Sequence, residues 1–266
     1  MLTIQNYVRV HSLEEAFELN QNKRNHILGG MLWLKMSNIT IPTAIDLSGL
    51  GLDTIEEQEE FFSIGAMVTL RQLELHPGLN AYTNGAMAKA VKDIVGVQFR
   101  NLATVGGSIF GRFGFSDVLT MFLGTETYVE LYKRGTVSLE EFVAMPKDRD
   151  ILARLIVKKE PGAFVYRAMR SSNTDFPILT CAASRVEGQY RVVIGARPGK
   201  AMQLRDTASI LSGGITPDSA RAFAEYTAAN IPTDSNIRGS AAYRTHLIKV
   251  LTERALLELG GLENGN

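Results

Sequence analysis

Two pairs of adjacent glycines, Gly29-Gly30 and Gly106-Gly107, are the residues of this chain best suited to hold a ligand. Each pair follows a short apolar run and precedes another structured segment. Glycine lets successive backbone N–H groups point into one concavity, and it lets a bulky ligand touch the main chain. Backbone donors of this kind can hold a diphosphate without any lysine or arginine. We therefore predict that the two loops come together and hold one diphosphate from both sides.

Other interpretations of a glycine pair remain open at this point, because such a pair is also typical of a simple tight turn. The better-known phosphate motifs are absent from the sequence. There is no Gly-x-Gly-x-x-Gly after a strand and no Gly-x-x-x-x-Gly-Lys-Ser/Thr loop. A Rossmann nicotinamide domain and a P-loop ATPase are both disfavoured.

Alternating helices and strands must position these loops. Ser12 begins a helix that runs to Leu19, and Thr69 caps another that runs to Leu75. Further helices are expected over residues 84–95, 138–143, 217–229 and 240–259, and strands over residues 26–28, 44–47, 128–132, 151–157, 164–169, 178–184 and 190–194. Turn residues divide the chain into three predicted units, at residues 1–52, 53–160 and 161–266.

The amino-acid composition excludes several classes of function. The 28 Lys and Arg residues balance 28 Asp and Glu residues, so the chain carries no basic surface for nucleic acid. The single cysteine, Cys181, excludes an internal disulfide and also an iron–sulfur cluster bound by this chain alone. The histidines show no zinc-like spacing, so no metal site is expected. No apolar run approaches membrane-spanning length, and the first residues lack a signal-peptide pattern, so we expect a cytoplasmic protein.

Four segments carry a resemblance to a known family. The best is the run of residues 100–109, RNLATVGGSI, which is similar to the family pattern R-N-x-A-T-I-G-G-N-I, with Asp117 at the position of a later acidic residue. Residues 27–30 (ILGG), 64–70 (IGAMVTL) and 237–244 (IRGSAAYR) resemble three other segments, in the family's order. The family is that of the FAD-binding subunits of molybdenum hydroxylases, which include xanthine dehydrogenase and carbon monoxide dehydrogenase.

The resemblance implies an α+β fold: a bipartite FAD-binding domain of the molybdopterin-dehydrogenase type, followed by a C-terminal α+β domain like that of the CO dehydrogenase flavoprotein. It also implies the FAD contacts. The diphosphate and nearby atoms would meet Ile27, Leu28, Gly29, Gly30, Met31, Leu32, Trp33, Thr104, Gly106, Gly107 and Ser108. Asp117 would hydrogen-bond the flavin end, and Ile94, Val95 and Leu152 would contact the adenine or ribose side.

The chain departs from the family pattern at several positions. Met31-Leu32 replaces polar residues, which keeps backbone donors but loses side-chain ones. Asp117 opens an apolar helical run, so it is also a candidate helix cap. Trp33 is interpreted as a core residue, with stacking on the cofactor as the alternative. Arg112 is expected to face solvent, with a charge placed near FAD as the alternative.

The family resemblance implies an FAD-dependent oxidoreductase subunit without catalytic side chains of its own. Electrons would pass from a large molybdopterin subunit to a small iron–sulfur subunit. This chain would take them from the small subunit and pass them to an acceptor such as NAD. Two alternatives stay open: a stand-alone flavin oxidoreductase, and a scaffold subunit of the same assembly that has lost its flavin.

Overall fold

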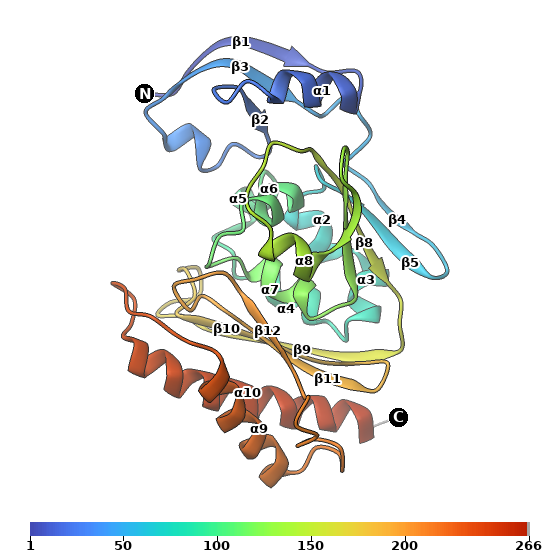
Figure 1. The fold of residues 1–266 in the computed structure, drawn as a ribbon, viewed down its shortest axis with the longest axis vertical. Helices are drawn as coiled ribbons and strands as arrows, with labels where there is room; N and C mark the ends of the chain where they lie inside the picture. Colours follow the sequence, from blue (N-terminus) through green and yellow to red (C-terminus); the bar gives the residue numbers. More distant parts are fainter. Residues whose placement is uncertain (265–266) are drawn as a thin grey trace. The chain divides into compact units, whose positions relative to one another are not determined.

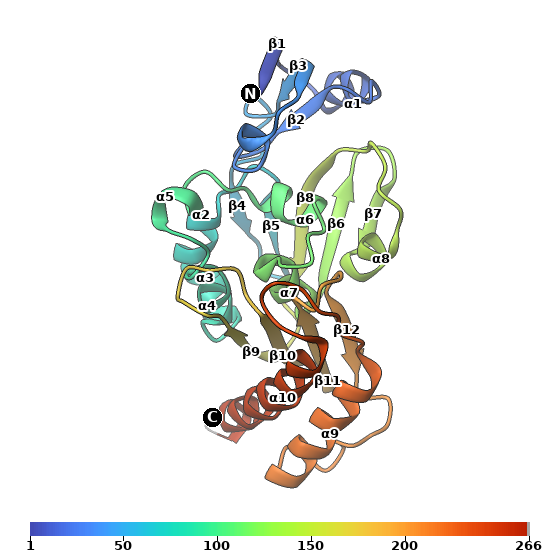
Figure 2. The same ribbon diagram turned by 90° about the vertical axis from the view of Figure 1, so that its left-hand side faces the viewer.

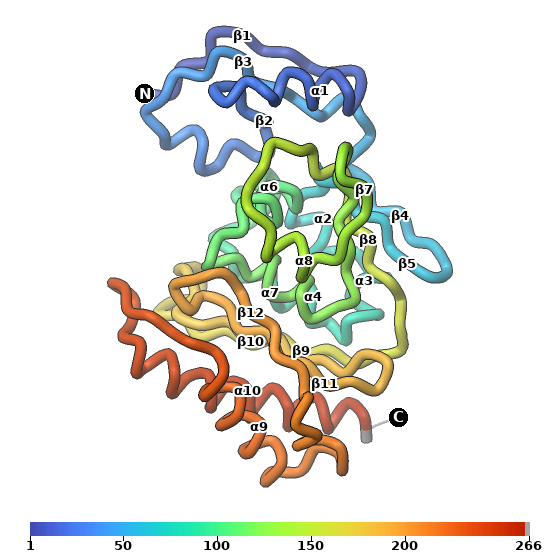
Figure 3. The backbone as a smooth tube through the Cα atoms, in the orientation of Figure 1, coloured from blue at the N-terminus to red at the C-terminus, as the bar shows by residue number. Residues whose placement is uncertain are grey.

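The computed structural model describes residues 1–264 of the chain, which divide into two units. The first unit comprises Met1–Gln72, Val97–Gly111 and Thr127–Lys158, and the second comprises Leu73–Gly96, Arg112–Glu126 and the remainder of the chain from Lys159. The chain therefore leaves and re-enters each unit, a path that can be followed in Figure 3. Both glycine pairs belong to the first unit.

A small parallel sheet begins the first unit. Its strands are β1 (Thr3–Arg9), β3 (Thr40–Asp46) and β2 (His26–Leu28), in that spatial order. Helix α1 (Leu13–Asn20) connects β1 to β2 and begins at Ser12, whose side chain accepts a hydrogen bond from the Glu15 amide, as expected. The single-turn helix η1 (Leu34–Met36) lies between β2 and β3. The first glycine pair thus directly follows β2.

A five-stranded antiparallel sheet forms the rest of the first unit (Figure 2). Its order is β4 (Ile55–Glu57), β5 (Phe61–Gly65), β8 (Leu152–Lys158), β6 (Thr127–Leu131) and β7 (Gly135–Ser138). The helices of this part are α5 (Val97–Arg100), α6 (Val105–Phe110) and α8 (Leu139–Ala144), while α2 (Leu70–Leu75) begins in it. Buried apolar residues join the two sheets, since Ala16 and Ile45 cluster with Ile151 and Ala153.

The second unit is built on an antiparallel sheet of β12 (Met202–Arg205), β11 (Gln189–Gly195), β10 (Leu179–Val186) and β9 (Gly162–Met169). Helices α9 (Pro217–Asn230) and α10 (Ala241–Asn264) cover one face, and α4 (Ala86–Val91) and α7 (Asp117–Leu123) pack on the other, as Figures 1 and 2 show. Helix α3 (Pro77–Tyr82) precedes α4. A core that includes Leu179, Phe223 and Leu251 lies between the sheet and the two long helices.

These elements confirm the predicted α+β class and most of its helices and strands. The helix expected over residues 84–95 is present but shorter than predicted, because α4 covers only Ala86–Val91. Asn84 and Gly85 have left-handed φ angles of 53° and 75°, and Val95 has one of 52°, so the backbone is not helical at either end of that range. The three-part division at residues 52 and 160 stays a prediction.

Candidate functional site: two touching glycine loops

The two glycine loops meet within the first unit. A Cβ atom placed on Gly30 would lie 1.9 Å from the Leu102 carbonyl oxygen, and one on Gly29 would lie 2.9 Å from Thr104 Oγ1. Both distances fall below the 3.0 Å that real Cβ atoms keep from other heavy atoms. The main chains are therefore in direct contact, and only glycine permits this approach. This confirms that the two loops converge.

The first loop offers a row of unused backbone donors. Among the described residues, no protein acceptor is found for the amide N–H groups of residues 29–32, which connect β2 to η1. Side chains contribute less to this loop, because Ile27 and Leu28 turn into apolar clusters and Leu28 is buried. Residues 29–32 are only partly buried, so these amides are open to a ligand, and successive free N–H groups of this kind are suited to an anion.

The second loop is built differently. Gly106 and Gly107 lie in the first turn of α6, and the hydroxyl of Thr104 caps that helix by accepting from the Gly107 amide at 3.2 Å. The Gly106 amide donates to the Ala66 carbonyl oxygen at 2.8 Å, and a Cβ on Gly106 would lie 2.7 Å from that same oxygen. The Gly106 amide is therefore already paired within the protein, and contact of Gly106 with a diphosphate stays a prediction. Gly106 allows close packing.

Thr104 supplies the donors on this side. Its backbone N–H and its hydroxyl hydrogen have no acceptor among the described residues, although Thr104 is buried. Its Oγ1 is the atom that a Cβ on Gly29 would meet, so the hydroxyl lies where the two loops touch. The Ser108 hydroxyl donates to the Thr104 carbonyl oxygen at 3.0 Å. Since a diphosphate only accepts hydrogen bonds, this set of donors fits the diphosphate of a dinucleotide.

Residues 31–33, which follow the first glycine pair, have apolar or aromatic side chains. Met31 has a left-handed φ of 58°, and its side chain packs on the apolar cluster of Leu28, Ile41 and Ala44. The amides of Met31 and Leu32 remain available as donors despite the loss of polar side chains. Trp33 is 41% exposed and has its ring edge-on to Phe99, with 6.5 Å between ring centroids. The interpretation of Trp33 as a core residue is therefore wrong.

Asp117, in the second unit, forms a buried charged cluster. Its Oδ1 accepts from Arg170 Nη2 and from the Tyr166 hydroxyl, each at 2.5 Å. The Asp117 and Arg170 side chains are only 5% and 8% exposed. The alternative that Asp117 caps α7 is wrong, because the preceding Ser116 does so by accepting from the Leu119 amide. The sequence did not reveal Tyr166 and Arg170 as its partners.

Burial dominates the electrostatics of this cluster. Desolvation raises the pKa of the Asp117 carboxyl, and the Arg170 guanidinium and the Tyr166 hydroxyl oppose that shift. Burial acts to lower the pKa of Arg170, but the Asp117 carboxylate outweighs it and the pKa is raised. Burial also raises the pKa of Tyr166, so the Tyr166 hydroxyl stays protonated and donates a hydrogen bond to Asp117. The cluster thus presents a fixed carboxylate held by two donors.

The remaining predicted contacts are dispersed. Leu152 opens β8 in the first unit and is 5% exposed, whereas Ile94 is half-buried and Val95 is 43% exposed in the second unit. Their contact with the adenine side stays a prediction. Arg112 is 4% exposed, so the expectation that it faces solvent is wrong. Its φ of 47° places it in a left-handed turn directly after α6 and its Gly111 cap.

A loop pair of this kind on an α+β scaffold is consistent with a protein that binds a dinucleotide. Residues 2–159 match the family described as the FAD binding domain in molybdopterin dehydrogenase, and residues 164–259 match the CO dehydrogenase flavoprotein C-terminal domain. The chain belongs to this family of molybdopterin dehydrogenase FAD-binding domains, and its cofactor is FAD. The family resemblance of the sequence is confirmed.

Three similar proteins match this chain over nearly their whole length. The nicotine 6-hydroxylase medium subunit of Paenarthrobacter nicotinovorans is 26% identical over 96% of each chain. The glyceraldehyde dehydrogenase medium chain of Sulfolobus acidocaldarius is 24% identical over 95% of this chain and 97% of its own. A chain of carbon monoxide dehydrogenase from Hydrogenophaga pseudoflava shares the fold, with a TM-score of 0.84 and 21% identity over 97% of each chain. Across residues 1–264, no helix is both long and apolar enough to cross a membrane.

Proposed function

We propose that this chain is the FAD-carrying subunit of a multi-subunit molybdenum-containing oxidoreductase of the xanthine dehydrogenase type. A large molybdopterin subunit passes electrons to a small iron–sulfur subunit. This chain takes the electrons from the small subunit and passes them to an acceptor such as NAD. The observation that carries this proposal is the pair of touching glycine loops with unused donors, in a chain of the FAD-binding family. Two similar proteins bear the names medium subunit and medium chain, which supports a role beside partner chains.

The cysteine content supports a separate iron–sulfur chain. Cys181 is the one cysteine in the sequence, and it is fully buried with its Sγ 4.0 Å from Thr252 Oγ1. Burial raises the pKa of its thiol to about 12, so it remains protonated at neutral pH. An iron–sulfur cluster requires about four thiolate ligands. The clusters that deliver electrons to FAD must therefore be held by another polypeptide.

The residues of this chain bind and orient the cofactor. When bound, FAD supplies the redox chemistry through its flavin ring. The amides of residues 29–32 and the N–H and hydroxyl of Thr104 would donate hydrogen bonds to the diphosphate and so stabilise its negative charge without a lysine or arginine. Asp117, whose Oδ1 accepts hydrogen bonds from Arg170 and Tyr166, is the residue that we propose for the flavin end. We also place the protein in the cytoplasm, where an unpaired cysteine is usual.

Purification of the native complex through an affinity tag on this chain tests the proposal. We expect a yellow preparation with flavin absorption, together with a small partner that contains iron–sulfur clusters and a large partner that contains molybdenum. Recovery of the flavin-loaded chain without any iron–sulfur partner would contradict the proposal and favour a stand-alone flavin enzyme. A colourless complex that cannot be reconstituted with FAD would favour a scaffold role.

A further inference from the structure

The spacing between the two glycine loops depends on how the small parallel sheet is attached to the five-stranded sheet. The first loop follows β2 of the small sheet, and the second forms the start of α6, which packs on the larger sheet. The shared apolar cluster around Ile45 and Ile151 favours association, but apolar contact alone is not directional. A directional contact is therefore needed to fix the distance at which the loops face each other.

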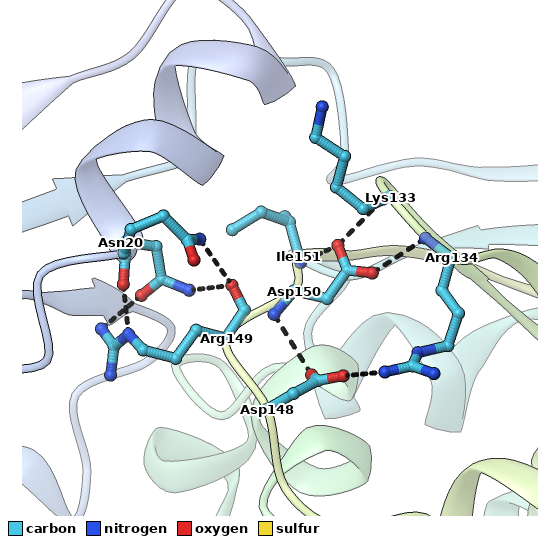
Figure 4. Close-up of polar contacts among 8 residues, drawn as sticks. Asn20, Lys133, Arg134, Asp148, Arg149, Asp150 and Ile151 are labelled. Atoms are coloured by element: carbon cyan, nitrogen blue, oxygen red, sulfur yellow. Dashed lines mark hydrogen bonds and ion pairs between the residues drawn. The ribbon is translucent and has the colours of Figure 1, made fainter.

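Arg149, just before β8, makes such a contact. Its Nη2 donates to Asn20 Oδ1 at 2.7 Å and to the Asn25 carbonyl oxygen at 2.8 Å, and its Nε donates to the Asn20 carbonyl oxygen. In return, the Asn20 side-chain amide donates to the Arg149 carbonyl oxygen at 2.8 Å (Figure 4). Asn20 and Asn25 are both only 5% exposed. This is a reciprocal, largely buried connection.

The hydrogen-bond partners of Arg149 lie at the two ends of the turn between α1 and β2. Asn20 ends α1, whose last carbonyl groups lack helical partners, and no basic residue occupies the last turn of that helix. Asn25 immediately precedes β2, and β2 leads directly to Gly29. One guanidinium therefore holds both ends of the turn between α1 and β2. These hydrogen bonds therefore fix the orientation of β2 and, with it, the position of the first glycine loop.

The loop that carries Arg149 is itself held firmly. The Asp150 carboxylate accepts from the amides of Lys133, Arg134 and Ile151 at 3.0, 3.0 and 2.8 Å, as drawn in Figure 4. Asp150 is 6% exposed, so these bonds are shielded from water. Lys133 and Arg134 form the turn between β6 and β7. Arg149 is thus anchored to the five-stranded sheet, which also packs against α6.

We propose that Arg149 is a positioning residue for FAD: its guanidinium, fixed to the five-stranded sheet, sets the separation of the two glycine loops and hence the affinity for the diphosphate. This inference rests on FAD binding by this chain. Lysine cannot replace arginine here, because a single ammonium group cannot reproduce the planar fork that reaches Asn20 and Asn25 together. The role is distinct from holding the fold, which the apolar cluster continues to do.

The test compares Arg149→Lys with a matched control, Arg134→Lys. The Arg134 side chain belongs to the same region, but its ion pair with Asp148 at 2.9 Å is exposed, at 51% and 33%. FAD and ADP are titrated into the full-length chain, with the fluorescence of Trp33 as readout. Trp33 is the one tryptophan in the sequence and closely follows the first loop. Circular dichroism and thermal melts of the FAD-free chains confirm that each variant is folded at the temperature of the titration.

We expect the Kd of Arg149→Lys for both FAD and ADP to rise about tenfold or more, while the Kd of Arg134→Lys stays within about twofold of the unaltered chain. An unchanged Kd in folded Arg149→Lys would overturn the inference, as would an equal loss in Arg134→Lys. Failure of Arg149→Lys to fold would also overturn it, because Arg149 would then hold the fold instead of the loop spacing. If the unaltered chain itself bound no FAD, the proposed function would fail first.

Discussion

Substitution of Gly30 by alanine should weaken FAD binding strongly. The added Cβ would lie 1.9 Å from the Leu102 carbonyl oxygen, whereas real Cβ atoms keep at least 3.0 Å. The two loops must therefore separate by about 1.1 Å, the difference between these two distances. A hydrogen bond of ordinary length stretched by that amount is lost. Loss of two bonds to a charged diphosphate, at about 1.5 kcal/mol each, predicts a rise in the Kd for FAD on the order of 100-fold.

Titration of the FAD-free Gly30→Ala chain with FAD, followed by Trp33 fluorescence and by equilibrium dialysis, measures this effect. Gly213→Ala is the matched control, because a Cβ on Gly213 meets nothing within 4 Å and its φ is not left-handed. The control should bind FAD like the unaltered chain. If a folded Gly30→Ala chain kept its FAD affinity within about threefold, contact between the loops would not set that affinity.

Three further predictions concern stability. Gly106→Ala should lower the free energy of unfolding of the FAD-free chain by about 1–3 kcal/mol in urea titrations, because its Cβ would lie 2.7 Å from the Ala66 carbonyl oxygen. Arg170→Met should cost about 3–5 kcal/mol by the same assay, since it leaves Asp117 buried without its cation, and adding Asp117→Leu should recover much of that loss. Between pH 9 and about 12 the folded chain keeps the Cys181 proton that the unfolded chain releases, so stability should fall as pH rises, and Cys181→Ala should reduce that slope.

Each of these has a contrary outcome. A Gly106→Ala chain as stable as the unaltered one would mean that α6 can shift away from Ala66 without cost. A double variant at Asp117 and Arg170 no more stable than Arg170→Met alone would show that the buried charge is not the source of the loss. Identical pH slopes with and without Cys181 would mean that the thiol ionises equally in the folded and unfolded chains.

Local sequence signals predicted much of the fold. Ser12 and Thr69 began helices because a short hydroxyl side chain can accept from a backbone amide in the first turn. Strand β1 was not anticipated: its side chains are mostly exposed, so the residues lack the apolar pattern that indicates a strand. The helix expected at residues 84–95 is shorter in the structure, because the left-handed Asn84 and Gly85 precede its first residue, which helical periodicity does not reveal.

The candidate site was predictable in position but not in detail. Adjacent glycines indicated where backbones approach closely, and Gly30 against Leu102 bears this out. The pattern could not show that Ala66 uses the Gly106 amide, because that bond joins segments far apart in the sequence. The same holds for Arg170, which reaches Asp117 across 53 positions of the chain. An acidic residue in an apolar helical run was the one signal that a buried cation should be sought.

Amide hydrogen exchange in the first glycine loop reports whether this loop holds the diphosphate of FAD. NMR of the 15N-labelled chain with and without FAD would follow the amides of residues 29–32, which have no acceptor within the described part of the protein. We predict rapid exchange in the FAD-free chain and slowed exchange at these amides once FAD is bound, as the diphosphate accepts their hydrogen bonds. Equally fast exchange at all of these amides in the FAD-bound chain would contradict the claim that this loop holds the diphosphate.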